Sequence, residues 1–229
     1  MKKRIISAVA AVCLVLSSAA ALPRGVFDTT PTITASAVST ETSGTCGKNL
    51  TWTLNDGVLT ISGVGPMTNY NNYNESPFYG RTDIQSVYIN SGVTSIGDHA
   101  FNSCNNLVSI SVKNTVVRIG MAAFSGCKGL MDISIPSNVK YIGDSAFSGC
   151  TTLTSVNIPA SVESIGKHAF YGCTNLASIT IPNGLTNIGG WAFLETKWLE
   201  NEQKKNPLVV VNGMLIDART YKGELTVPR

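Results

Sequence analysis

Residues 141–159 read YIGDSAFSGCTTLTSVNIP and residues 164–182 read SIGKHAFYGCTNLASITIP, so one phrase returns after 23 residues. Its Ile-Gly pair occurs five times in the chain, beginning at Ile96, Ile119, Ile142, Ile165 and Ile188. A period of this length is typical of a solenoid, in which each copy buries its apolar face against its neighbours. The repeat therefore predicts a solenoid over residues 84–199.

Two further apolar positions keep the period. A phenylalanine follows each isoleucine by five residues, at Phe101, Phe124, Phe147, Phe170 and Phe193. A leucine follows each phenylalanine by six, at Leu107, Leu130, Leu153, Leu176 and Leu199. Because these positions coincide when the copies are stacked, we expect the phenylalanine column to form most of the core.

Cysteines occupy a third repeated position, at Cys104, Cys127, Cys150 and Cys173, with Thr196 in the fifth copy. One residue type at one repeat position indicates a packed column, in which cysteine acts as a small buried hydrophobe. Parallel side chains in register do not readily adopt the near-perpendicular dihedral angle of a disulfide. The pattern therefore predicts reduced, buried thiols.

Within a copy, the residues predict a short strand, a second extended piece and a turn. In residues 178–182, Ile179 and Ile181 alternate with polar residues as in a strand with one buried face. The second piece contains Ile165, and we expect the following glycine to allow a tight bend or a positive φ. Residues 144–150 predict a helical or 3₁₀ turn with its Ala and Phe pointing inward.

The chain begins with a predicted signal peptide, residues 1–37. Lys2, Lys3 and Arg4 precede an apolar run rich in small residues, which is the pattern of an exported protein. Residues 35–37 (Ala-Ser-Ala) fit the cleavage rule, and residues 19–21 offer an earlier site. We expect no membrane span after removal of this segment.

The remaining segments frame the repeats. Residues 38–45 are a predicted polar linker, and residues 46–83 a predicted N-terminal cap: a hairpin around Asp56-Gly57, then a degenerate first repeat marked by Phe78. Residues 200–224 are an expected insertion with a hairpin around Asn212-Gly213. Residues 225–229 begin a further repeat, so we expect the chain to continue or to self-associate through this uncapped end.

The phrase xx-Ile-Gly-xx-Ala-Phe-xx-Cys-xx-Leu-xx-Ile-x-Ile-Pro resembles the BspA-like (Treponema pallidum type) leucine-rich repeat family. The resemblance covers residues 84–199, and Phe78 and residues 225–228 extend it. It implies a leucine-rich repeat solenoid of short parallel strands and turns, on a secreted or surface-located bacterial protein that functions in adhesion and protein–protein contact. The family has no catalytic residues to transfer to this sequence.

Composition and spacing argue against several kinds of function. Four of the 17 basic and one of the 14 acidic residues lie within residues 1–37, which leaves 13 of each. A neutral chain lacks the charge of a nucleic-acid binder. The cysteines do not have the spacing of a zinc site, and no acid or histidine stands beside them to activate a nucleophile. We therefore expect no metal, no cofactor and no enzymatic activity.

Two surfaces remain as candidate binding sites. The first is a concave sheet formed by outward strand residues, namely Ser86, Tyr88, Ser109, Ser111, Asp132, Ser134, Ser155, Asn157, Ser178 and Thr180; solenoids commonly bind ligands on such a sheet. The second comprises Trp191, Trp198 and the insertion of residues 200–224, because an insertion that interrupts a repeat often carries the function. The predicted function is a secreted or cell-surface module that binds a protein or a glycan. A structural spacer in a larger secreted protein is the alternative.

Overall fold

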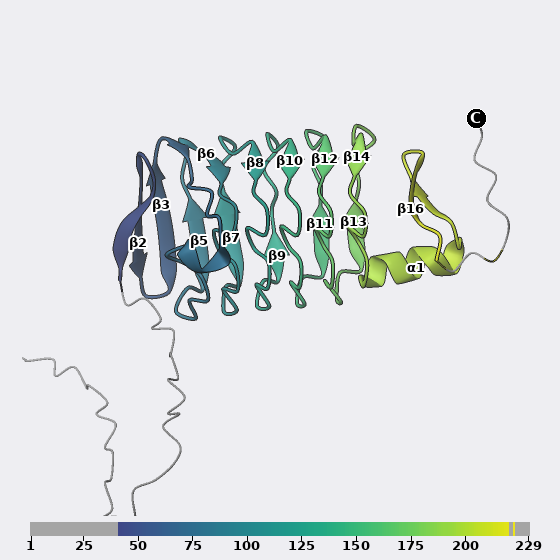
Figure 1. The fold of residues 1–229 in the computed structure, drawn as a ribbon, viewed down its shortest axis with the longest axis horizontal. Helices are drawn as coiled ribbons and strands as arrows, with labels where there is room; N and C mark the ends of the chain where they lie inside the picture. Colours follow the sequence, from purple (N-terminus) through teal and green to yellow (C-terminus); the bar gives the residue numbers. More distant parts are fainter. Residues whose placement is uncertain (1–40, 220–221, 223–229) are drawn as a thin grey trace, which may run out of the picture. The chain divides into compact units, whose positions relative to one another are not determined.

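A computed structural model describes residues 41–219 and residue 222 of the chain. Its repeats form a solenoid whose 23-residue turns, here called rungs, follow one another along the long axis of Figure 1. Each rung contributes one strand to each of two parallel ladders, which confirms the predicted fold class. The signal peptide of residues 1–37 and the further repeat at residues 225–229 lie outside the described residues.

The first ladder runs from the N-terminal cap into the repeats. It contains β1 (Ser43–Gly47), β2 (Leu50–Asn55), β3 (Val58–Gly63), β5 (Ser86–Ile89), β7 (Ser109–Val112) and β9 (Asp132–Ile133). A bridge from Ser134 to Asn157 continues it to β11 (Ser155–Asn157) and β13 (Ser178–Thr180). Residues one period apart face each other, as in Ser155 opposite Ser178.

The second ladder contains the short extended piece that ends in Ile-Gly. Its strands are β4 (Gly65–Pro66), β6 (Val93–Ile96), β8 (Arg118–Ile119), β10 (Tyr141–Ile142), β12 (Ser164–Ile165) and β14 (Asn187–Ile188). Ile142 pairs in register with Ile119 on one side and Ile165 on the other. The 23-residue period of the sequence is thus the register of the ladder.

The predicted turn after Ile-Gly forms a third set of bonds between rungs. The Cys127 N–H donates to the Phe124 carbonyl three residues earlier, which is the bond of a 3₁₀ turn. Ala122 has a φ of 48°, and this left-handed residue prevents the turn from propagating as a helix. The N–H groups of Ala122 and Phe124 instead donate to Asp144 and Ala146 of the next rung, both over 2.8 Å.

The glycine of the Ile-Gly pair serves a purpose other than the expected positive φ. A Cβ built on Gly143 would lie 2.6 Å from the backbone carbon of Gly120 and the backbone nitrogen of Met121. Positive φ values occur two residues later, at Ala122 and Ser145. Glycine is therefore required by the close approach of neighbouring rungs.

A stack of six phenylalanine rings, one from each rung and one from the degenerate first repeat, runs through a core that also contains the Ile, Leu, Val, Ala and Cys columns. Phe78, Phe101, Phe124, Phe147, Phe170 and Phe193 have centroid separations of 5.1–5.7 Å and interplanar angles of 5–13°. A tryptophan closes each end edge-on: Trp52 lies 5.3 Å from Phe78 and Trp198 lies 5.1 Å from Phe193. The two tryptophans thus cover the outer faces of the first and last phenylalanine rings, Phe78 and Phe193.

The N-terminal cap contains the predicted hairpin, formed by β2 and β3. β3 then pairs in parallel with β5, so the hairpin is joined directly to the first ladder. The expected linker 38–45 differs from the structure at its end, because residues 43–45 belong to β1 and pair with β2. A short 3₁₀ helix, η1 (Tyr73–Glu75), precedes Phe78.

At the other end lies a helix that the sequence did not predict, α1 (Lys197–Lys205), which begins before the expected insertion of residues 200–224. The Thr196 hydroxyl accepts a hydrogen bond from the Leu199 N–H and caps its N-terminus. The predicted hairpin follows as β15 (Val209–Val211) and β16 (Met214–Asp217). Because α1 carries Trp198, this helix covers the apolar end of the ring stack.

The cysteine column is reduced and buried as predicted. Each thiol donates to the carbonyl of the phenylalanine in the preceding rung: Cys127 to Phe101 over 3.1 Å and Cys173 to Phe147 over 3.0 Å. Burial raises the pKa of the Cys127 thiol from 9.0 to about 12. The column thus supplies both packing and a weak donor to a carbonyl inside the core.

We expect Cys127→Ala to lower the free energy of unfolding by about 1–3 kcal/mol, because it leaves a cavity and removes a buried donor. In the unmodified chain, the thiols should resist a thiol reagent until denaturant is added. The raised pKa also predicts a pH dependence: between about pH 9 and 12 the thiol ionises only in the unfolded chain, so stability falls as the pH rises. Denaturant titrations measure the stability of the variant and its dependence on pH, and thiol counting measures the protection of the thiols. Rapid labelling of the native chain would contradict the predicted burial.

Candidate binding site

The outward residues of the first ladder lie where they were predicted. We call them the serine face; its residues Tyr88, Ser109, Ser111, Asp132, Ser134, Ser155, Asn157, Ser178 and Thr180 are all exposed. Tyr88 stands opposite Ser111, and Ser109 opposite Asp132, so the side chains form two straight columns. Ser86 is half-buried and lies 3.1 Å from Ser109, oxygen to oxygen.

The two tryptophans proposed as a second binding surface have different positions. Trp191 is 61% exposed, and its ring lies edge-on to His168 at a centroid distance of 5.1 Å. Trp198 is only 9% exposed, because it packs against Phe193. Trp198 therefore belongs mainly to the core and leaves only a small part of its side chain at the surface.

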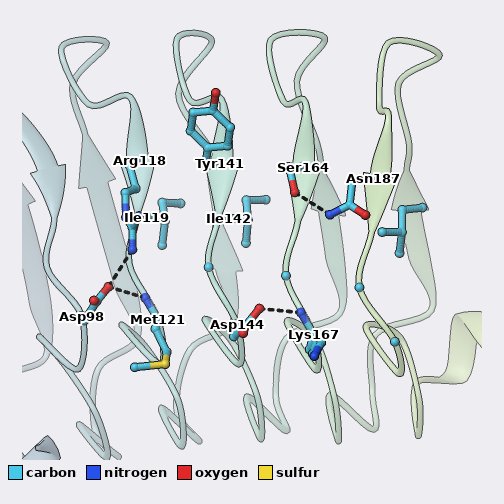
Figure 2. Close-up of a pocket in the computed structure, with 15 residues that line it drawn as sticks. Asp98, Arg118, Ile119, Met121, Tyr141, Ile142, Asp144, Ser164, Lys167 and Asn187 are labelled. Carbon is cyan, nitrogen blue, oxygen red and sulfur yellow. Dashed lines mark hydrogen bonds and ion pairs between the residues drawn. The ribbon is translucent and has the colours of Figure 1, made fainter. Parts of the chain in front are cut away.

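A groove on the second ladder is a site that the sequence analysis missed. Its volume is about 630 Å³, and it crosses β8, β10, β12 and β14 (Figure 2). Two columns of side chains border it, one residue before the isoleucine and two residues after it. The first column contains Arg118, Tyr141, Ser164 and Asn187, and the second contains Asp98, Met121, Asp144 and Lys167. The Ile-Gly pairs lie between them.

Hydrogen bonds between rungs hold one wall of the groove. Asp98 Oδ1 accepts from the backbone N–H of Met121 over 2.7 Å and from the Arg118 guanidinium over 3.1 Å. Asp144 Oδ1 accepts from the backbone N–H of Lys167 over 2.7 Å. Figure 2 shows both carboxylates reaching from one rung to the next. The two carboxylates are thereby held in place before any ligand arrives.

The other wall presents an aromatic ring and an amide. Tyr141 is 47% exposed, and its hydroxyl donates to Glu163 over 3.4 Å. Glu163 also pairs with Lys140 at 3.0 Å and raises the pKa of that amine through the hydrogen bond and its charge. The Asn187 amide donates to Ser164 Oγ over 2.9 Å. This wall differs in chemistry from the small hydroxyls of the serine face.

The described part of the chain gives no sign of metal or membrane chemistry. No group of three or more His, Cys, Asp or Glu side chains could hold a metal ion in residues 41–219 and 222. Within the same residues, no helix has the length and hydrophobicity that crossing a bilayer requires. His99 and His168 have φ values of 58° and 56° at equivalent turn positions three rungs apart.

A model of the BspA type leucine-rich repeat region matches residues 69–201 in six copies. The matched range includes Phe78, the ring of the degenerate first repeat. No curated protein matches the chain significantly.

Several solved bacterial structures resemble the fold. A leucine-rich repeat protein from Eubacterium ventriosum is 26% identical, with a TM-score of 0.42, over 69% of this chain and 64% of that one. A leucine-rich cell surface protein from Faecalibacterium prausnitzii is also 26% identical, with a TM-score of 0.50, over 70% of this chain and 56% of that one. The T. pallidum leucine-rich repeat protein is 22% identical, with a TM-score of 0.48, over 70% and 94%. The chain thus spans less than two thirds of the first two proteins.

Proposed function

The chain belongs to the BspA-type leucine-rich repeat family, and from this premise we propose that it is a secreted or cell-surface binding module without catalytic activity. The similarity to a bacterial cell surface protein at a TM-score of 0.50 supports the location. The predicted signal peptide supports the same location. The ligand is a protein or a glycan presented at a cell surface.

The groove on the second ladder is the observation that carries this proposal. Arg118 and Met121 are 48% and 40% exposed, and Tyr141 stands beside them on the next rung. Tyrosine, methionine and arginine are enriched at binding interfaces, whereas serine is depleted. The groove is therefore a better candidate surface than the serine face, where Tyr88 is the one large aromatic side chain.

Binding can be tested with the purified chain against extracellular matrix proteins, mucin glycans and plant cell-wall polysaccharides. We expect saturable binding to at least one of them by biolayer interferometry. The double variant Arg118→Ala/Tyr141→Ala should raise the dissociation constant at least about 30-fold. This corresponds to a loss of about 2 kcal/mol of binding free energy, as expected when hot-spot side chains are removed.

A matched double variant on the serine face, Tyr88→Ala/Asp132→Ala, separates the two surfaces. If this variant loses binding and the groove variant retains it, the ligand lies on the serine face. If no protein or glycan binds, the binding proposal fails. A spacer role would then be the better explanation, since rungs joined by three sets of hydrogen bonds make a stiff rod.

A further inference from the structure

We infer that the groove binds a neutral glycan, with one pyranose ring stacked on Tyr141 and its hydroxyls bonded to both walls. This inference rests on the proposed binding function and names its ligand class. A cavity of about 630 Å³ is within the range of small-ligand sites. It crosses the four strands β8, β10, β12 and β14, so its length is about 14 Å at the spacing of a β-ladder. That length accommodates a short linear oligosaccharide.

The charges of the groove are balanced, which favours a neutral ligand. Two carboxylates, Asp98 and Asp144, and two cations, Arg118 and Lys167, line the groove. Asp98 and Arg118 already form an ion pair at 3.1 Å. An anionic ligand would approach the Asp144 carboxylate, and a cationic one the Lys167 ammonium, so each would meet repulsion as well as attraction.

Hydrogen-bonding groups of both kinds remain open along the groove. In the second column, the backbone N–H groups of Asp98, Met121 and Lys167 each donate to a side-chain oxygen of the preceding rung. The acceptors are Asn69, Asp98 and Asp144, in that order. The backbone N–H groups of Asp144 and Gly190 have no such acceptor among the described residues. At the same position of the preceding rung stand Met121 and Lys167, whose side chains carry no acceptor oxygen.

One acceptor also remains open, on the Asn187 side chain. The Asn187 amide uses one N–H on Ser164, and its oxygen accepts no hydrogen bond from the described residues. A sugar hydroxyl donates and accepts at once, so it satisfies a mixed set that neither a carboxylate nor an ammonium group could satisfy. This mixture of open donors and an open acceptor therefore points to a polyhydroxylated ligand.

Ring stacking requires a fixed aromatic side chain above an unobstructed floor. Tyr141 meets the first condition, because its hydroxyl is held by Glu163, which is itself paired with Lys140. The floor between the columns consists of Ile-Gly pairs, and Ile119 and Ile142 are buried, so few side-chain atoms project from it. A flat ring can therefore approach the backbone while its apolar face covers the tyrosine.

A peptide fits the groove less well. The strands β8, β10 and β12 are hydrogen-bonded on both sides, so a peptide backbone could pair only with the edge of β14, at one end of the groove. The isoleucines that line the floor are mostly covered; Ile119 and Ile142 are 0% and 2% exposed. A peptide would thus find neither backbone partners nor apolar pockets along most of the groove.

The test uses the whole chain and isothermal titration with linear hexasaccharides of β-1,4-linked glucose, mannose and xylose. Hexagalacturonate serves as the charged comparator. We expect at least one neutral hexasaccharide to bind, with a dissociation constant that changes less than about twofold between 50 and 500 mM NaCl, since no ion pairs form. Tyr141→Ala should weaken binding at least tenfold, and Tyr141→Phe, which keeps the ring, less than threefold.

Tyr73→Ala is the matched control, because Tyr73 is 52% exposed but lies in η1 of the cap. It should leave binding unchanged. Failure of all neutral probes, salt-sensitive binding of hexagalacturonate alone, or equal losses for Tyr73→Ala and Tyr141→Ala would overturn the inference. A protein ligand that depends on Arg118 and Tyr141 would also overturn it, while leaving the proposed binding function intact.

Discussion

Phe147→Ala is expected to lower the free energy of unfolding by about 3–5 kcal/mol. The ring lies in the middle of the stack, 5.4 Å from Phe124 and 5.3 Å from Phe170, and it is fully buried. Its removal leaves a cavity between two rungs whose backbones are held by three sets of hydrogen bonds and cannot move together to fill it. The two neighbouring rings each lose a stacking partner as well.

The control is Ser155→Ala, on the serine face. Ser155 is exposed and its side chain forms no hydrogen bond in the described structure, so the change should stay within about 0.5 kcal/mol. Urea denaturation monitored by circular dichroism and tryptophan fluorescence gives both values. Equal losses at the two positions would mean that the assignment of inner and outer faces is incorrect.

The repeat was predictable because the 23-residue period of the sequence equals the spacing between residues that pair in the parallel ladders. Residues that recur every 23 positions must lie beside each other in a parallel stack, so Phe147, Cys127 and Ile142 could be placed in columns without a structure. The hairpins at Asp56-Gly57 and Asn212-Gly213 could be placed because a two-residue turn of this kind fixes the strand register.

The elements that were missed depend on contacts outside the period. Helix α1 begins where the fifth copy replaces cysteine with Thr196, whose hydroxyl caps the helix. Trp198 was taken for a surface residue because exposure of a tryptophan cannot be judged without knowing what covers the last ring of the stack. Phe193 is that ring, and Trp198 is the residue that covers it.

The groove was missed for a different reason. Binding residues were sought among the outward positions of the longer strands, where the columns contain mostly Ser, Thr and Asn. The columns beside Ile-Gly contain larger and more varied side chains, including Arg118, Tyr141 and Lys167. Variation at a fixed outward position was the signal, because a repeat needs no particular residue there for folding.

Gly143→Ala is expected to destabilise the solenoid by about 3 kcal/mol, at the upper end of the range for overpacking. The new methyl group would lie 2.6 Å from the Gly120 carbon and the Met121 nitrogen, and backbone atoms cannot rotate away as a side chain can. The Gly143 N–H donates to the Ile119 carbonyl over 2.9 Å, so separating the rungs to admit the methyl would also strain this bond.

Gly190→Ala supplies the matched control for this change. Gly190 lies in the same second-ladder region, yet a Cβ built on it meets no atom within 4 Å, and its φ is not positive. The substitution should therefore alter stability by less than about 0.5 kcal/mol. Thermal and urea unfolding of the two variants measure the difference. A Gly143→Ala variant as stable as Gly190→Ala would show that the rungs can separate locally, and that close backbone approach does not determine the glycine column.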